Sequence, residues 1–176
     1  MNTADNLFER LLPEGFDRLP ATVRRLHRAS GRRSYHGDVV VRRGRGLLSR
    51  LCGWATGLPP AGNGPIRVDI QSTPDREAWT RHVAGHAMSS RLWGGGGLLR
   101  ERLGLVTFGF RLRASADGLD WAVERVHVFG LPLPARLFDG VHARESERGG
   151  RYAFHVVAAL PGAGALVEYQ GVLDVD

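Results

Sequence analysis

The sequence predicts a mainly β protein of the α+β class, an antiparallel β-barrel or strongly curved sheet of about 8–9 strands with two or three N-terminal helices. Three observations support this fold. From Gly64 onward, apolar residues recur with a period of two, as in half-buried strands. Turn signals follow one another at short intervals, which favours sequential hairpins. So many antiparallel strands would leave long exposed edges unless the sheet closed on itself.

The first third of the chain has helical spacing, interrupted by one strand. "NLFERLL" and "ATVRRLHRAS" place apolar residues three and four apart, and the second segment is bounded by Pro20 and Gly31. A strand is predicted near residues 35–43. "RGLLSRLCGWATGL" then predicts an amphipathic helix over residues 46–57, with Cys52 on the apolar side and therefore in the core.

The remaining segments alternate like strands. "VTFGFRLR" is the clearest example, because every second side chain is apolar. Counting residues 35–43, about nine strands are predicted. By contrast, "FGLPLPARLF", residues 129–138, is predicted to be an extended crossover, because Pro132 and Pro134 cannot donate to a ladder. The other strands are predicted near residues 65–73, 76–83, 86–93, 99–115, 118–129, 141–148, 151–159 and 165–174.

The chain of 176 residues is expected to form a single domain, 1–176, with a basic, helix-rich cap region at 1–60 and an antiparallel β meander at 61–176. The cap region holds 11 Arg and 5 acidic residues, a net charge of +6, whereas the meander holds 13 of each. One Cys cannot form an intramolecular disulfide. Neither a signal peptide nor a transmembrane segment is predicted, so the expected location is cytoplasmic.

A basic turn follows the first predicted strand. Arg42, Arg43 and Arg45 stand beside a predicted helix start, where they suit a phosphate or lipid headgroup, the alternative being a solvated turn. The neighbouring "GRGLLS" resembles part of a dinucleotide fingerprint, yet it lacks the third glycine and no βαβ unit follows. Nucleic-acid binding is not predicted, because Tyr35 is the one aromatic residue in 20–50.

No catalytic set, metal site or cofactor is predicted. His82 and His86 flank a predicted turn, where a spacing of four does not direct both rings to one ion. "AMSSRLWG" lacks the glycines of a nucleophile elbow. Glu101, Glu124 and Glu168 fall on predicted strands, where each either acts as an acid or base in a cavity or pairs with a nearby arginine.

Six strings, taken in order from about residue 19 to the last strand, resemble the bacterial family known as domain of unknown function four-one-six-six. They are "LPATVRRLHRASG", "GDVVVRRGRGLLSRLCGWATGLPPAG", "WTRHVAGHAMSS", "LRERLGLVTFGFRL", "GLDWAVERVHVFGLPLPARL" and "GALVEYQGVL". Domains of that family are often attached C-terminally to a saccharopine-dehydrogenase-like reductase, so the resemblance implies such a reductase as a partner. It implies no catalytic residues. The position after Arg81 is usually aromatic in that pattern, and here it is His82.

The leading functional hypothesis is a non-enzymatic binding module that holds a small apolar or amphipathic, lipid-like ligand in a barrel cavity. One alternative is an accessory domain that docks on the reductase through the proline segment. Another is an enzyme that uses Glu101 or Glu124 as its acid or base. The predicted ligand-binding residues are Trp54, Trp79, Arg81, Phe108, Phe110, Trp121, Leu131 and Leu133, and the predicted anion-binding residues are Arg42, Arg43 and Arg45.

Overall fold

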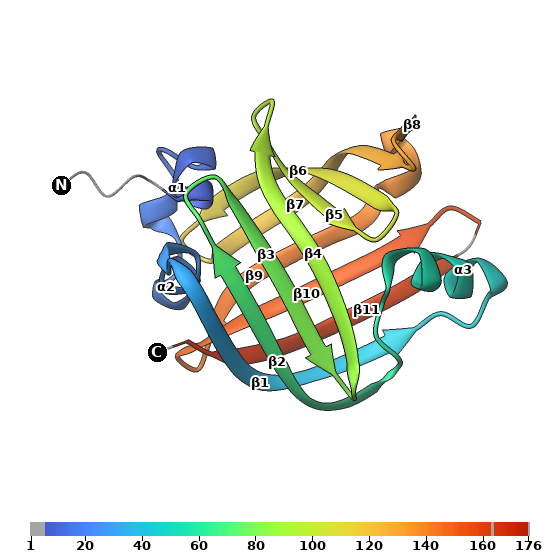
Figure 1. The fold of residues 1–176 in the computed structure, drawn as a ribbon, viewed down its shortest axis with the longest axis horizontal. Coiled ribbons are helices and arrows are strands. Elements are labelled where there is room, and N and C mark those ends of the chain that lie inside the picture. Colours follow the sequence, from blue (N-terminus) through green and yellow to red (C-terminus); the bar gives the residue numbers. More distant parts are fainter. Residues whose placement is uncertain (1–5, 163, 176) are drawn as a thin grey trace.

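A closed antiparallel β-barrel dominates the computed structural model, which describes residues 6–162 and 164–175 (Figure 1). The side chains of residues 48, 52 and 55 are outside this part, so the predicted core position of Cys52 lies outside the described residues. The mainly β fold predicted from the sequence is confirmed. The strands are β1 (Gly31–Arg43), β2 (Gly62–Ser72), β3 (Arg76–Val83), β4 (His86–Gly95), β5 (Leu98–Leu103), β6 (Val106–Ser115), β7 (Gly118–Val128), β8 (Leu131–Leu133), β9 (Gly140–Arg148), β10 (Arg151–Leu160) and β11 (Gly164–Asp174).

The strand order shows how the barrel closes. Neighbours run β6-β5-β4-β3-β2-β1-β11-β10-β9-β7, and β7 then pairs with β6. Every pairing is antiparallel, and all neighbours except β1–β11 and β7–β9 are consecutive strands. β1 and β2 are joined by residues 44–61, and the other consecutive pairs are hairpins. Closure leaves the ladder without free edges, which is the physical reason that a meander of this length forms a barrel rather than an open sheet.

The helices lie at the two ends of the barrel (Figure 1). We call one end the closed end, because α1 (Leu7–Leu11), η1 (Phe16–Arg18) and α2 (Ala21–Arg28) pack over it and bury their apolar side chains in the core. We call the other the open end. It carries α3 (Leu47–Thr56) and η2 (Ala135–Phe138).

Two carboxylates of β9 hold α2 against the barrel. Glu147 accepts hydrogen bonds from the backbone N–H and the hydroxyl of Thr22, at 3.0 and 3.1 Å, at the positive N-terminal end of the helix. Near the other end of α2, His27 contacts Glu145. Thr22 and His27 are both buried, so these contacts add to the apolar packing that holds α2 on the closed end.

The strand count is slightly higher than predicted, for two local reasons. Residues 98–115 form the hairpin β5–β6 instead of one strand, because Gly104 adopts a φ of 54° and turns the chain. Its neighbours Leu103 and Leu105 are apolar, so no polar turn residue marks this turn in the sequence. In addition, Leu131–Leu133 of the predicted crossover form the short strand β8.

β8 and η2 fill a seam in the barrel wall. β7 pairs with β9 only over Leu119–Ala122, and farther along it pairs instead with β8 over Val126–Val128. The ring of Phe138 in η2 meets Phe108 edge-on at 6.2 Å between centroids. The proline segment therefore covers an opening between two wall strands, and its apolar residues divide between the core and the surface.

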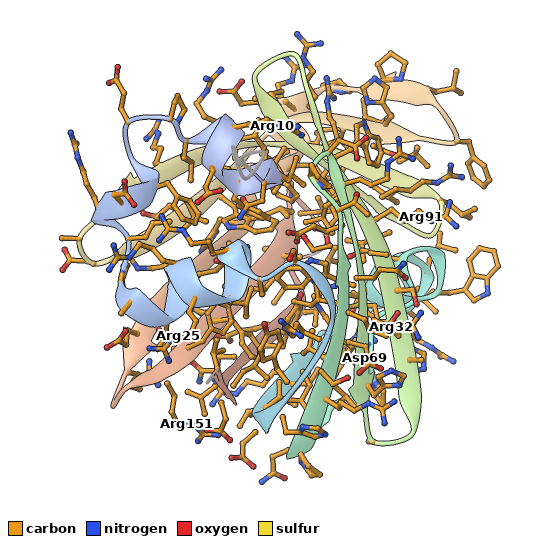
Figure 2. All side chains as sticks on the ribbon, turned by 60° about the vertical axis from the view of Figure 1, so that its left-hand side comes forward. Arg10, Arg25, Arg32, Asp69, Arg91 and Arg151 are labelled. Atoms are coloured by element: carbon orange, nitrogen blue, oxygen red, sulfur yellow. The ribbon has the colours of Figure 1, made fainter. Side chains whose placement is uncertain are left out.

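Arginine side chains project from the outside of the barrel and of its helices, as Figure 2 shows for Arg10, Arg25, Arg32, Arg91 and Arg151. Within the described residues, no helix is long and apolar enough to cross a membrane. Positive charge is thus a property of much of the outer surface.

Replacing Gly171 of β11 with alanine should lower the free energy of unfolding by about 1–3 kcal/mol. A Cβ at this position would overlap the backbone carbonyl oxygen of Asp38 and lie 2.6 Å from Cζ of Phe154, so the sheet or the ring must move. Urea unfolding measures the change. Gly64→Ala on β2 is the matched control, because its Cβ would meet no atom within 4 Å; equal losses for both variants would contradict this close-packing explanation.

Candidate functional site

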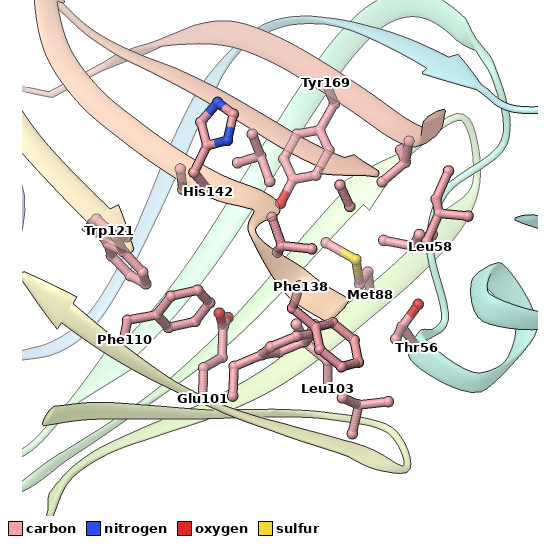
Figure 3. Close-up of a pocket in the computed structure, with 18 of the residues that line it drawn as sticks. Thr56, Leu58, Met88, Glu101, Leu103, Phe110, Trp121, Phe138, His142 and Tyr169 are labelled. Atoms are coloured by element: carbon pink, nitrogen blue, oxygen red, sulfur yellow. The ribbon is translucent and has the colours of Figure 1, made fainter. Parts of the chain in front are cut away.

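A cavity of about 430 Å³ extends into the barrel from the open end (Figure 3). Such a volume lies within the range of small-molecule pockets, roughly 300–1,000 Å³. Near the open end its lining includes Leu51, Trp54, Thr56, Leu58, Met88, Leu103, Leu105, Phe129, Leu133, Phe138 and Leu160. Deeper in the barrel it is lined by residues such as Trp79, Phe108, Phe110, Trp121, Ala143, Phe154, Val167 and Leu173.

The alternation of the strands produces this lining. Tyr152, Phe154, Val156 and Ala158 share one face of β10 and all line the cavity. The same period of two places Trp79 and Arg81 of β3 inside the barrel. Most lining side chains are apolar, so the hydrophobic effect would favour an apolar ligand there over water.

Arg81 and Glu101 form the ion pair of the cavity wall. Their closest atoms, Nη2 and Oε1, are 3.5 Å apart, and the two side chains are 13% and 7% exposed. Nη1 of Arg81 also donates to the Ser90 hydroxyl at 3.1 Å, and its guanidinium lies 5.1 Å from the Trp79 ring centroid. The pair keeps a cation and an anion at the cavity without leaving either uncompensated.

Two tyrosine hydroxyls add neutral polar groups. Figure 3 shows the side chain of Tyr169 entering the cavity from β11, on the side opposite Glu101. Burial raises the pKa of Tyr169. The pKa of Tyr152 is raised well above its ordinary value, first by burial and then by the neighbouring Glu145 carboxylate. Both hydroxyls therefore remain protonated at neutral pH and are able to donate a hydrogen bond.

Glu145 joins the cavity to the closed end. Its Oε2 lies 2.6 Å from Nε2 of His27, whose ring is fully buried and stacks on Phe8 with centroids 3.7 Å apart. Burial by itself lowers the pKa of His27, but the charges of Glu145 and then Glu77, with the Glu145 hydrogen bond, outweigh it and raise the pKa. The geometry is that of a buried ion pair beneath α2.

A second buried carboxyl, Glu77, lies behind this pair. It accepts hydrogen bonds from Nε1 of Trp79 at 2.6 Å and from the Ser72 hydroxyl at 3.1 Å. Burial raises the pKa of Glu77 in spite of the opposing effects of His27 and these two donors. Because Glu77 does not line the cavity, its hydrogen bonds hold Trp79 in place rather than offering a group to a ligand.

The structure brings most of the predicted ligand-binding residues to one cavity. Its lining includes Trp54, Trp79, Arg81, Phe108, Phe110, Trp121 and Leu133. Leu131 is not among the lining residues, and its side chain is exposed at the start of β8. The two leucines belong to the short strand β8, where Leu133 lines the cavity and Leu131 does not.

The predicted anion-binding arginines are separated in the fold. The Arg43 guanidinium donates to the backbone carbonyls of Leu58 and Pro59, at 3.3 and 2.9 Å, and ties the end of α3 to β1. Arg42 lies on the outer face of β1 and is 3.7 Å from Glu168. Arg45 is exposed beside α3. Anion binding by these residues remains a prediction, and Arg43 has a structural contact that the sequence did not indicate.

The carboxylates considered for catalysis take different positions. Glu101 lines the cavity, whereas Glu124 and Glu168 do not. Glu124 pairs with Arg111 on the outer surface through two hydrogen bonds. Glu168 accepts a contact from His155 at 2.9 Å. The hydrogen bond with Arg111 is the main cause that lowers the pKa of Glu124. The hydrogen bond with His155 is the main cause that lowers the pKa of Glu168.

The histidines of the considered metal pair are held by different partners. Nε2 of His82 lies 2.9 Å from Asp69, and Nε2 of His86 lies 2.8 Å from the backbone oxygen of Gly57. Among residues 6–162 and 164–175, no three His, Cys, Asp or Glu side chains gather as a metal ion would require. His82 makes a side-chain contact between neighbouring strands, and His86 anchors the end of α3.

Sequence reasoning missed several polar lining residues, among them His142, Glu145, Tyr152 and Tyr169. The position of Tyr152 was predictable, because alternation along β10 places it on the same face as the apolar residues Phe154 and Val156. No comparable signal marks Glu145, since a carboxylate on a strand face is usually solvated. Its role depends on His27, which lies 118 residues earlier in the chain.

The family model described as Domain of unknown function (DUF4166) matches residues 19–173, which span the chain from just before α2 almost to the end of β11. No curated protein matches the chain. The matched residues include both of the buried ion pairs, Arg81–Glu101 and His27–Glu145.

Proposed function

The chain belongs to the family Domain of unknown function (DUF4166), and from this premise we propose that it is a non-enzymatic binding module that holds a small apolar or amphipathic, lipid-like ligand in its barrel. One observation carries the proposal. The cavity of about 430 Å³ opens at one end and is apolar along most of its wall, with a few polar groups among its lining residues. Pockets of this character typically use apolar area for affinity and the few polar groups for orientation.

The charges around the cavity indicate what kind of polar end such a ligand has. Arg81 is paired with Glu101, and His27 is paired with Glu145, so each of these enclosed charges already has a partner. A permanently charged headgroup would add an unpaired charge to a desolvated site, which is costly. The Tyr169 hydroxyl suits a neutral hydroxyl, carbonyl or protonated acid instead, whereas the Tyr152 hydroxyl already hydrogen-bonds to Glu145.

An acid–base enzyme has narrower support. Glu101 is the carboxylate considered from the sequence that lines the cavity, and it already accepts a contact from Arg81 at 3.5 Å. A pairing of this kind is common for structural carboxylates. Docking on a reductase, the other alternative, would use exposed apolar residues of the open end such as Leu131.

Filling the cavity should abolish ligand binding without unfolding the barrel. Ala158 lines the cavity on β10, so the indole of Ala158→Trp would occupy ligand space. Binding is measured by the fluorescence of an environment-sensitive fatty acid, and by native mass spectrometry of freshly purified protein. Saturating ligand at a hundred times its dissociation constant should stabilise the wild type by about 2.7 kcal/mol.

Val157→Trp is the matched control, since Val157 is the preceding residue of β10 and does not line the cavity. It should bind the probe as the wild type does. The proposal is wrong if the wild type neither carries a co-purified ligand nor binds acyl probes, or if Ala158→Trp and Val157→Trp bind them equally.

A further inference from the structure

The helix at the open end packs with its small, polar side toward the barrel. Ser49 and Gly53 are buried, and the Ser49 hydroxyl donates to the carbonyl of Leu166 in β11 at 3.0 Å. By contrast, the side chains of Leu47, Leu51 and Trp54 are 83%, 59% and 74% exposed. An amphipathic helix normally buries its apolar side. Here the Ser49 hydrogen bond holds the small residues Ser49 and Gly53 against the barrel, while Leu47, Leu51 and Trp54 are exposed.

A second apolar segment lies at the same end. Phe129 and Leu131, in and after the β7–β8 turn, are 73% and 69% exposed. Phe129 adopts a φ of 52°, which is uncommon and strained for an aromatic residue, and its N–H donates to the carbonyl of Leu105 at 3.1 Å. The ring is largely exposed and stands at the cavity mouth. We call Leu47, Leu51, Trp54, Phe129 and Leu131 the apolar collar.

The turns at the two ends of the barrel differ in chemistry. Those at the open end, at residues 84–85, 104–105, 129–130 and 161–162, contain no charged residue. At the closed end, two turns contain Asp75 and Asp117, the Gly149-Gly150 turn stands between two arginines, and the Gly96-Gly97 turn is uncharged. Since all these turns are reached by water in a free barrel, the apolar character of one end is specific to that end.

Positive charge surrounds the collar, and acidic residues are scarce there. Residues 39–68, which include α3, hold five Arg and no Asp or Glu. Arg45 and Arg50 are exposed, and so is Arg136 of η2. Within the part of the chain that the structure describes, none of the three forms an ion pair with a carboxylate. Large apolar groups beside unpaired arginines complement a surface that is apolar inside and anionic outside.

We propose that the open end docks on an anionic lipid bilayer, with the apolar collar inserted at the level of the headgroups and Arg45, Arg50 and Arg136 on lipid phosphates. Exposed Trp and Leu on a helix flanked by arginines are typical of segments that lie in the membrane interface. The cavity mouth lies in this same face, since Leu51, Trp54 and Phe129 also line the cavity. A lipid-like ligand would then pass between bilayer and barrel without crossing water.

This proposal rests on the proposed function and adds where the ligand would be exchanged. Membrane docking itself is tested without any ligand. Sedimentation of the protein with vesicles of equal parts phosphatidylcholine and phosphatidylglycerol, at low ionic strength, should show binding at least about tenfold tighter than with phosphatidylcholine alone. Salt should weaken it, because the arginine contacts are screened. Arg45→Gln/Arg50→Gln should reduce the preference for the anionic vesicles.

Leu47→Glu/Leu131→Glu should abolish vesicle binding, because both side chains belong to the collar and neither lines the cavity. The matched control, Gln71→Glu/Ala116→Glu, adds the same charge at exposed positions near the closed end and should bind vesicles nearly as the wild type does. Circular dichroism confirms that each variant is folded. Ala158→Trp should keep vesicle binding, so a failure of docking and a failure of ligand binding are distinguishable.

Three results would overturn the docking proposal. One is an absence of wild-type binding to anionic vesicles at low ionic strength. Another is self-association of the wild type that Leu47→Glu/Leu131→Glu removes, which would make the collar an interface between copies of the chain. Association with a purified protein partner in place of vesicles would assign the same surface to protein recognition and would likewise contradict a bilayer.

Discussion

Glu145→Ala should lower the free energy of unfolding by about 3–5 kcal/mol, because it leaves the His27 imidazole buried with its main charge partner removed. The His27 ring is fully buried beside the rings of Phe8 and Trp79. Water therefore cannot replace the lost carboxylate without opening the closed end. Urea unfolding at about pH 6, below the ordinary His pKa, measures the loss. The N-terminal helices should also show faster hydrogen exchange, because α2 loses one of its two tethers to β9.

Glu124→Ala is the matched control. It removes a carboxylate from an ion pair on the outer surface, where water solvates the remaining Arg111, so the unfolding free energy should change little. Equal losses for the two variants would show that the burial of the His27–Glu145 pair carries no special weight, and the expected difference between a buried and an exposed pair would be wrong.

The same pair makes stability depend on pH in a defined direction. The pKa of His27 is raised in the folded protein, so its contribution is fully present below about pH 6.5, the ordinary value in the unfolded chain. That contribution is lost as pH rises through the higher, folded pKa. The raised pKa of Glu77 acts in the same direction from about pH 4.3 upward. Above about pH 6.5 the wild type should therefore lose stability as pH rises, and His27→Gln should show a shallower decline over that range.

Arg81→Met should also cost about 3–5 kcal/mol, because it strands the Glu101 carboxylate at the cavity wall. Methionine keeps much of the volume of the stem, so lost packing is a minor part of the change. Urea unfolding again measures it.

The double variant Arg81→Met/Glu101→Leu separates charge from packing. With both charges gone, much of the lost stability should return, since no uncompensated group remains in the apolar wall. If the double variant is no more stable than Arg81→Met, the pair contributes through packing alone. If Arg81→Met is as stable as the wild type, the cavity wall is well hydrated, which would also weaken the case for an apolar ligand.

The strand pattern was largely predictable from the sequence, and its failures have local causes. The segment 106–113 alternates cleanly and forms β6, because each apolar side chain there faces the core. The β5–β6 hairpin was missed because Gly104 turns the chain between two leucines. β8 was missed because prolines in its sequence argue against a ladder, yet Val126 and Val128 of β7 pair with Leu133 and Leu131.

The cavity was predictable in part. Aromatic residues such as Phe108 and Trp121 face inward by strand parity, so their place in the lining follows from the sequence once a barrel is assumed. The polar groups were harder to predict. Glu101 was considered together with Glu124, which differs from it in lying on the outer face. Which carboxylate faces inward depends on the register that each strand adopts in the closed barrel.

The alternation of apolar residues and the spacing of the turns determine the barrel, because burying one face of so many strands leaves few other closed arrangements. Tertiary contacts decide the rest. His27 and Glu145 become a pair only when α2 folds over β9, and Ser49 of α3 faces the barrel because it donates to the carbonyl of Leu166 in β11. Such contacts join residues far apart in the chain, so periodicity, which reports only local order, does not encode them.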